Sequence, residues 1–329
     1  MRGQCPINCP DSDVKMWGQN IFHGLSTNES AALFHILMFF TYANITIKFY
    51  YTMKICEFRG GLGNQLFEYA HYLYMKKKYP DEKFYGYYPS RELWCHQGLE
   101  IHKRFDVCLP KSSKITDLIG WILFTCNRKE YLSPFVKMLG VVSDDTNVKE
   151  YALLQEGYWQ DRKYFANDFR FEYRCDGLNQ RTKDFCKELK SLSYTIVSVH
   201  IRRGDYLTCD CPQDFAGICT PKYYENAFQY ISSNIEKPLF VFFSDDSNFV
   251  REEFHLPNMI VVDWNKGEDS WQDMFLMSQC KAMILANSTF SFWAAQNNKN
   301  KPVVLCPTKW NNLLNPQITM PGWIEVPSV

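Results

Sequence analysis

Short apolar runs alternate with longer amphipathic segments through the second half of the chain. Buried strands are predicted from the apolar runs, at residues 194–202, 239–243, 259–262, 282–286 and 303–306. Helical spacing fills the gaps between these runs, at residues 221–234, 270–280 and 287–296. Strands and helices that alternate in this way predict a parallel sheet with helices on both faces.

The first half carries one clear unit of strand, glycine turn and helix. Residues 54–59 predict a strand, Gly60-Gly-Leu-Gly-Asn-Gln65 predicts a tight turn, and residues 66–78 have helical spacing. Glycines let backbone N–H groups approach a ligand, and a helix N-terminus favours negative charge. The unit therefore predicts an anion site, although a purely structural turn explains it equally well. Further elements of this half are expected as a strand at residues 84–88 and helices near 115–124 and 175–191.

Residues 1–52 do not share the pattern of the rest. The apolar run at residues 31–43 is shorter than the ~20 residues that a membrane-spanning helix needs. Two interpretations stay open, a weak membrane anchor and an extension upstream of a start at Met53, and we favour the second. The remaining 277 residues (329 − 52) suit two domains, which we place at 53–190 and 191–329.

Composition narrows the class of protein. Hydrophobic residues make up 46% of the chain, which excludes a disordered composition, and 36 basic residues balance 36 acidic ones, so no nucleic-acid partner is indicated. The 13 cysteines are scattered and odd in number, which is typical of reduced thiols in a cytoplasmic protein. Cys209, Cys211 and Cys219 lack the paired knuckles of most zinc sites, and free cysteines in a loop explain them better.

The strand predicted at residues 194–202 carries the strongest candidate chemistry. His200 and Arg202 share a face because they are two positions apart, and Arg203 and Asp205 follow at the exit. Parallel sheets bind ligands beyond the carboxyl ends of their strands, and guanidinium groups match phosphate geometry. The motif therefore predicts a phosphate or diphosphate site. A surface ion pair explains it about equally well, whereas an Arg-Gly-Asp adhesion signal does not suit a motif fused to a buried strand.

Two further polar motifs follow predicted strands. Asp245 follows one strand, and residues 287–291 follow another. Parallel strands present their carboxyl ends at one edge, so both motifs should meet the Arg202 motif there. Ser288 and Thr289 offer hydroxyls beside the free N–H groups of a helix start, although helix capping alone also explains them.

Five motifs together resemble one family of glycosyltransferases. They are Gly60-Gly-Leu-Gly-Asn-Gln65, Gly157-Tyr-Trp-Gln160, His200-Ile-Arg-Arg-Gly-Asp-Tyr206, Phe243-Ser-Asp-Asp246 and Asn287-Ser-Thr-Phe-Ser-Phe-Trp293. In this order, over about residues 53–310, they are similar to the α-1,2-fucosyltransferases of glycosyltransferase family 11.

The resemblance implies an α/β, GT-B-like fold of two Rossmann-type domains facing across a cleft. The first domain would hold the acceptor and the second would bind GDP-β-L-fucose. The resemblance also implies inversion of configuration, no cofactor and no required metal. The single Asp-x-Asp of the chain, at Asp11 and Asp13, lies outside the matching motifs.

The resemblance further implies roles for individual residues. Arg202 would grip the β-phosphate, His200 would lie beside the diphosphate, and Asp273 would read the guanine. From the residues alone, Asp273 closes a capping-box pattern that starts at Ser270, so the two interpretations compete. The other donor contacts are expected from Gly61, Gly63, Asn64, Gln65, Arg203, Asp245, Asn287, Ser288, Thr289 and Phe290.

The function implied is transfer of L-fucose from GDP-fucose to the 2-hydroxyl of a galactosyl residue on a glycan. Arg202 would stabilise the charge that grows on the leaving diphosphate. The catalytic base stays open between Asp205, whose pKa the two arginines should depress, and Glu68. The alternatives are another fucosyl linkage, α-1,6 or to protein, and a non-enzymatic module that binds nucleotide sugars or glycans. A peripheral membrane association is also left open by the apolar run near the start.

Overall fold

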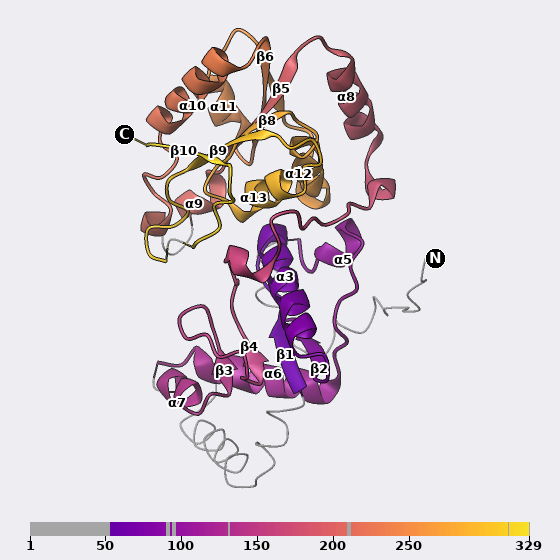
Figure 1. Ribbon diagram of the computed structural model, residues 1–329, viewed down its shortest axis with the longest axis vertical. Helices are drawn as coiled ribbons and strands as arrows, with labels where there is room; N and C mark the ends of the chain where they lie inside the picture. Colours follow the sequence, from indigo (N-terminus) through magenta and orange to yellow (C-terminus); the bar gives the residue numbers. More distant parts are fainter. Residues whose placement is uncertain are drawn as a thin grey trace. The chain divides into compact units, whose positions relative to one another are not determined.

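The computed structural model describes residues 53–89, 93, 97–130, 132–208, 212–314 and 316–328, and of Asp205 and Thr208 it describes the backbone alone (Figure 1). The expected leader, residues 1–52, lies outside the described residues. The chain divides into two compact units, and each is described by itself. The first comprises residues 53–60, 71–99 and 108–159, and the second comprises residues 61–70, 100–107 and 160–329, within the ranges just given.

A four-stranded parallel sheet forms the centre of the first unit. Its order is β2-β1-β4-β3, with β1 (Met53–Glu57), β2 (Lys83–Tyr87), β3 (Val142–Ser143) and β4 (Leu154–Gln155). Ile55 pairs with Tyr85 on one side and with Leu154 on the other, so β1 is an inner strand. Helices α6 (Lys114–Asn127) and α7 (Ser133–Met138) pack on the sheet through apolar residues such as Leu123 and Val136.

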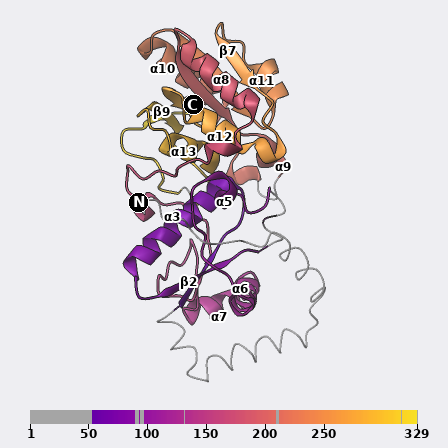
Figure 2. The same ribbon diagram turned by 90° about the vertical axis from the view of Figure 1, so that its right-hand side faces the viewer.

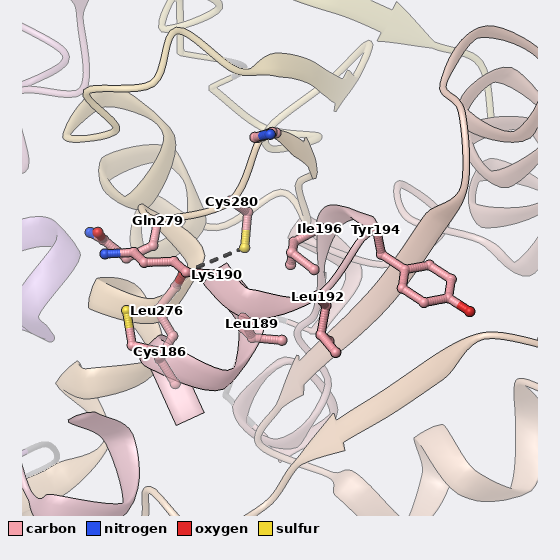
Figure 3. A pocket seen from close by; sticks show the side chains of 10 residues that line it. Cys186, Leu189, Lys190, Leu192, Tyr194, Ile196, Leu276, Gln279 and Cys280 are labelled. Carbon is pink, nitrogen blue, oxygen red and sulfur yellow. Dashed lines mark hydrogen bonds between the residues drawn. The ribbon is translucent and has the colours of Figure 1, made fainter. Parts of the chain in front are cut away.

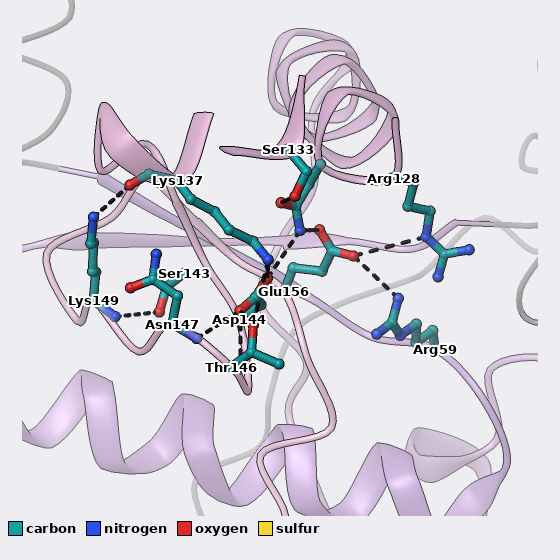
Figure 4. A network of polar contacts seen from close by, with 11 residues as sticks. Arg59, Arg128, Ser133, Lys137, Ser143, Asp144, Thr146, Asn147, Lys149 and Glu156 are labelled. Atoms are coloured by element: carbon teal, nitrogen blue, oxygen red, sulfur yellow. Dashed lines mark hydrogen bonds and ion pairs between the residues drawn. The ribbon is translucent and has the colours of Figure 1, made fainter. Parts of the chain in front are cut away.

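Charged side chains beyond the carboxyl ends of this first sheet neutralise one another (Figure 4). Arg59, two residues after β1, lies 3.3 Å from Glu156 and 3.6 Å from Glu57. Lys137 on α7 lies 2.7 Å from Asp144, which follows β3. These carboxylates have low exposure, and a buried charge is tolerated only when it is paired. The network therefore holds the connections that leave β1, β3 and β4.

A six-stranded parallel sheet forms the centre of the second unit, much of which is drawn in orange and yellow in Figure 2. Its order is β10-β9-β8-β5-β6-β7, with β5 (Thr195–Ile201), β6 (Pro238–Ser244), β7 (Met259–Val262), β8 (Ala282–Ile284), β9 (Val303–Pro307) and β10 (Ile324–Val326). Val197 in β5 pairs with Phe240 in β6 and with Ala282 in β8, so β5 is an inner strand. The predicted α/β class with parallel sheets is confirmed in both units.

Helices cover the second sheet and connect its strands. They are α8 (Gln180–Ser191), α9 (Gly204–Thr208), α10 (Pro221–Asn234), α11 (Ser247–Glu253), α12 (Trp271–Met277) and α13 (Thr289–Gln296), with the 3-10 turns η1 (Arg162–Tyr164), η2 (Cys175–Gly177), η3 (Pro212–Asp214) and η4 (Gly267–Asp269). Helix α10 has its predicted bounds because Thr220 caps it and Pro221 occupies its first position. Helix α12 ends three residues early, because the N–H of Cys280 bonds to the carbonyl of Met277 in a tighter turn. In the part of the chain that the structure describes, every helix is too short or too polar to cross a membrane.

Aromatic side chains from distant segments pack together in the second unit. Phe67 on α3 (Leu62–Lys78) has its ring 4.8 Å from that of Phe292 and 5.0 Å from that of Trp293, both on α13. The ring of Phe165 lies 5.2 Å from Trp293. Truncating one such buried Phe to Ala typically costs about 3–5 kcal/mol. This packing explains why residues 61–70 belong to the second compact unit, whereas the sequence placed all of 53–190 in one domain. The division into an acceptor and a donor domain stays a prediction.

Helix α3 begins four residues earlier than the sequence predicted. Its first hydrogen bonds run from the N–H groups of Asn64 and Gln65 to the carbonyl of Gly61, at 2.9 and 3.1 Å. The turn before it needs a glycine because φ of Gly60 is +68°. Gly63, Asn64 and Gln65 therefore lie in the first turn of a helix, and the predicted glycine turn is confined to Gly60 and Gly61.

Candidate functional site

The motifs at the carboxyl ends of β5 and β6 meet as the sequence predicted. Ile201, the last residue of β5, pairs in the sheet with Ser244, the last residue of β6. Arg202 and Asp245 follow these two positions, and Nη1 of Arg202 lies 3.3 Å from Oδ2 of Asp245. The pair is partly exposed, with about a quarter of each side chain accessible, so a diphosphate could reach the guanidinium.

Asp245 also fixes the backbone that carries the two arginines. Its carboxylate accepts the N–H of Arg203 and the N–H of Gly204, each at 3.0 Å. A Cβ at Gly204 would lie 3.0 Å from Oδ2 of Asp245, so this position favours glycine. Asp245 was expected among the donor contacts, and in the structure its oxygens are taken up by the Arg202 loop.

Arg203 points to other partners than Arg202. Its Nε lies 3.3 Å from Asp246, and its guanidinium lies 3.9 Å from the centre of the Phe249 ring on α11. This is a surface ion pair with a cation–π contact, and such pairs contribute little to stability. The ion-pair interpretation therefore holds for Arg203, but its partner is Asp246. The side chain of Asp205, the partner that the sequence suggested, lies outside the described atoms.

His200 is a buried and neutral imidazole next to Arg202. Its side chain is 4% exposed, and its Nδ1 makes no hydrogen bond within the described residues. Burial, together with the charge of Arg202, lowers the pKa of His200 to about 3. Its ring centre lies 5.8 Å from that of Phe290. At neutral pH this imidazole can give or accept a hydrogen bond, but it carries no proton to release as an imidazolium.

Gly63 brings the start of α3 against the start of α13. A Cβ at Gly63 would lie 2.5 Å from Oγ1 of Thr289 and 2.7 Å from the backbone nitrogen of Phe290. Side chains do not fit at such distances, so Gly63 is explained by helix packing. Ser288 caps α13 by accepting the N–H of Phe290 at 3.3 Å, which bears out the capping interpretation for this residue.

Gln65 and Asn64 differ in what they contact. Gln65 is fully buried, and its Oε1 accepts the N–H groups of Glu100 and Ile101, at 2.9 and 3.2 Å, at the start of α5 (Ile101–Arg104). It was expected to contact the donor, and instead it caps a remote helix. Asn64 is half-buried, and its Oδ1 accepts the side-chain N–H of Gln160 at 3.1 Å. Two of the sequence motifs are thereby joined.

Asn287 supports the residues around Arg202 from the end of β8. Its carbonyl accepts the hydroxyl of Tyr206 at 2.7 Å, and its side-chain amide donates to the carbonyl of Trp310 at 3.4 Å. The guanidinium of Arg202 lies 5.9 Å from the centre of the Tyr206 ring. Asn287 is therefore placed to hold Tyr206 beside Arg202, and Gly61 contributes its carbonyl to the start of α3.

Asp273 is not the end of a capping box. Ser270 makes no side-chain cap to α12, and Oδ1 of Asp273 accepts a hydrogen bond from Nδ2 of Asn265 at 2.8 Å. The half-buried side chain lies in surroundings poor in water, and burial raises the pKa of Asp273 to about 8. Sequence reasoning missed Asn265, although it stands three residues beyond β7, where the strand-end rule applies.

Several other candidate site residues lie outside the described residues or are buried away from solvent. Cys209 and Cys211 lie outside the described residues, as does the side chain of Asp205. Glu68, the second candidate base, is 1% exposed on α3. Among the described residues, no group of three His, Cys, Asp or Glu is arranged to hold a metal ion.

A small cavity lies at the starts of β5 and β8, at the opposite end of β5 from Arg202 (Figure 3). Its volume is about 140 Å³, and its lining includes Ile196, Leu276, Cys280 and Lys281. Sites for drug-sized ligands are usually about 300–1,000 Å³. The cavity is therefore too small for a nucleotide sugar.

Known proteins are similar to this chain along most of its length. An O-antigen biosynthesis glycosyltransferase, WbnK, from Escherichia coli is 30% identical over 81% of this chain and 98% of its own. An alpha-1,2-colitosyltransferase from Escherichia coli is 28% identical over 79% of this chain and 92% of its own. A galactoside alpha-(1,2)-fucosyltransferase 1 from Ateles belzebuth is 36% identical over 31% of this chain and 28% of its own. Residues 57–326 match the family model, and the chain belongs to glycosyl transferase family 11.

Proposed function

We propose that the chain transfers L-fucose from GDP-β-L-fucose to the 2-hydroxyl of a galactosyl residue on a glycan, with inversion of configuration. The family supplies glycosyl transfer, and two of the relatives are named for 1,2-linkages. The observation that carries the proposal is the Arg202 loop. Its guanidinium stands at the carboxyl edge of β5, and Asp245 holds it in place before any donor binds.

Arg202 has the main electrostatic role in this mechanism. As fucose leaves, negative charge grows on the β-phosphate, and a cation already fixed nearby stabilises that charge without rearranging. His200 shares the strand face of Arg202, and because its imidazole is neutral it would lie beside the diphosphate without adding a second positive charge. The base that takes the acceptor proton stays unassigned between Asp205 and Glu68.

The nucleotide would lie along the same edge of the second sheet. Asp273 would accept the two adjacent N–H donors of guanine, because a carboxylate offers several acceptor positions. The start of α13, with Ser288, Thr289 and Phe290, would lie near the phosphates. Asn64 would approach from the start of α3, which packs on α13 through Gly63.

A second candidate donor is GDP-colitose. The observation in its favour is the alignment with the colitosyltransferase, which extends over 79% of this chain. Colitose lacks the 3-hydroxyl of fucose, so the guanine and diphosphate contacts proposed above would serve either donor. The choice between them lies in the contacts to the sugar.

A donor and acceptor screen tests the proposal. The purified chain is incubated with GDP-fucose or GDP-colitose and with glycans that end in galactose or in N-acetylglucosamine, and the products are assigned by NMR. The expected product carries α-linked fucose on O2 of galactose. Transfer from GDP-colitose alone would favour the second donor, and transfer to another hydroxyl would favour another linkage. Binding of GDP-fucose without any turnover would indicate a non-enzymatic module.

A further inference from the structure

Asn265 connects Asp273 to the start of helix α8. Its side chain is 6% exposed, and its Nδ2 donates to Oδ1 of Asp273 at 2.8 Å. On its other side, Oδ1 of Asn265 accepts from Oγ1 of Thr182 at 3.1 Å and from Nδ2 of Asn179 at 3.2 Å. A single buried amide therefore lies between the carboxylate and two fixed donors.

One backbone N–H sets the direction of this network. The N–H of Thr182 donates to Oδ1 of Asn179 at 2.8 Å, as the cap of α8. A backbone N–H can only donate, so the amide oxygen of Asn179 must face it and the NH₂ of Asn179 must face Asn265. Asn265 then presents its oxygen to Asn179 and its NH₂ to Asp273. The donor toward Asp273 is thus dictated by the network.

Asp273 keeps acceptor capacity that nothing within the described residues uses. Asn265 bonds to Oδ1, while Oδ2 makes no hydrogen bond within the described part of the chain. An ionised carboxylate accepts up to about four hydrogen bonds. Because the Asp273 side chain is only half-buried, a ligand that brings N–H groups could reach this acceptor.

We propose that Asn265 is a positioning residue for nucleobase recognition, which holds the Asp273 carboxylate so that it accepts the adjacent N–H groups of guanine. This inference rests on the proposed function. Adenine presents an acceptor where guanine presents its ring N–H, so the same carboxylate would repel adenine. Selection of guanine therefore depends on Asn265 as well as on Asp273.

The charge of Asp273 gives this role a measurable signature. Burial raises its pKa to about 8 and the Asn265 hydrogen bond lowers it, so loss of that bond should raise the pKa further. Guanine needs the ionised carboxylate, so affinity should rise with pH toward that pKa. Helix α13, which packs on α12, carries no charged residue. The charged groups on the other elements near α12 are Arg104 on α5, Glu268 and Asp269 on η4, and Arg181, Lys183, Asp184, Lys187, Glu188 and Lys190 on α8.

The test is calorimetric titration of GDP and ADP between about pH 6 and about pH 8.5. Asn265→Leu keeps the volume and removes the donor, and we expect GDP affinity at neutral pH to fall by at least about tenfold, with partial recovery as the pH rises. ADP binding should not change. Thr182→Val removes one of the donors that orient Asn265, and should shift the pH profile less, in the same direction.

Asn298→Leu is the matched control, because Asn298 is equally buried but bonds to the carbonyl of Cys280 and to the N–H of Asn300. It should lower the unfolding temperature and leave the pH profile of GDP binding as in the parent. A parent chain that does not bind GDP would overturn the proposed function. The positioning role alone would be overturned by three results together. The parent binds GDP, Asp273→Asn does not bind GDP, and Asn265→Leu keeps the parental pH profile of GDP binding. Where Asn265→Leu does not fold, a parental profile in Thr182→Val overturns it equally.

Discussion

Arg202 and Asp245 form an ion pair across two neighbouring strand ends, with 3.3 Å between Nη1 and Oδ2. The same carboxylate accepts the N–H groups of Arg203 and Gly204. The register of β5 and β6 sets this contact, because Ile201 pairs with Ser244 immediately before it. The direction in which Arg202 points therefore depends on a side chain from the adjacent strand.

Asp245→Asn should lower turnover by about tenfold, because the guanidinium loses the charge that orients it. Stability should fall modestly, because the partly exposed pair is worth about 0–1 kcal/mol and the amide can accept only one of the two backbone N–H groups that the carboxylate accepts. Asp246→Asn is the control, because it removes the partner of Arg203 and keeps an oxygen to cap α11. Steady-state kinetics and thermal unfolding of both variants check this, and equal losses of turnover would contradict it.

Arg202→Lys should lower turnover by at least about a hundredfold, the scale of removing one preorganised donor. Lysine keeps the charge but loses the planar fork, and an interaction that strengthens as the sugar leaves affects turnover more than donor binding. Arg203→Lys should be milder, because Arg203 is engaged by Asp246 and Phe249. Turnover near the parental value in Arg202→Lys, or activity lost to a chelator, would reject the proposed mechanism.

Five of the six strands of the second sheet could be predicted from the sequence, because they are apolar runs separated by helices, whereas the three-residue strand β10 was not predicted. Strand β7 and helix α10 have the predicted bounds, and β5, which was predicted to be buried, is an inner strand. Strands β3 and β4 have two residues each, which is too short for any alternation to show. Strand β4 forms because it pairs with the inner strand β1, and β3 forms because it pairs with β4.

The contacts of the site residues could be predicted only where a residue follows directly after the end of a strand. Arg202 and Asp245 meet because both follow strand ends, which the sequence reveals. Gln65 caps a helix that begins 36 positions later, and Gly63 touches Thr289. Such contacts depend on tertiary packing, which a local pattern does not contain. Asn265 follows a strand end and was nevertheless missed, because a single asparagine in a loop belongs to no motif or periodic pattern.

Asp273→Asn should weaken GDP binding by at least about tenfold and leave the fold intact. Asn265 can still donate to the remaining oxygen, and Ser270 makes no cap that could be lost. The native pKa of about 8 lies above the ordinary value of 3.8 for an aspartate, so the folded state binds more protons and the parent loses stability as pH rises between these values. The variant should lose less over that range. Parental GDP affinity, measured beside thermal unfolding at several pH values, would contradict the role in guanine binding.

A chain that begins at Met53 should fold and keep its activity. Within the described residues the first strand begins at Met53, and the family match begins at residue 57. Comparing the activity of the shortened and full-length chains measures whether residues 1–52 are needed. Cell fractionation of both chains measures whether these residues attach the protein to membranes. Loss of soluble activity on shortening would reject the interpretation of these residues as an upstream extension.

Gly63→Ala should destabilise the protein and weaken donor binding together. In an open helix this change would add up to about 1 kcal/mol of stability, because alanine favours helix more than glycine does. Here the new Cβ would lie within 2.7 Å of backbone atoms of Thr289 and Phe290, and overpacking typically costs about 1–3 kcal/mol. Backbone cannot move aside like a flexible side chain, so the start of α13 must shift, and with it the residues proposed to lie near the phosphates. Gly177→Ala is the control, because its nearest contact would be an ordinary 3.4 Å to Trp271. Thermal unfolding and GDP titration of both variants check this prediction. A parental unfolding temperature and GDP affinity in Gly63→Ala would contradict the close packing of the starts of α3 and α13.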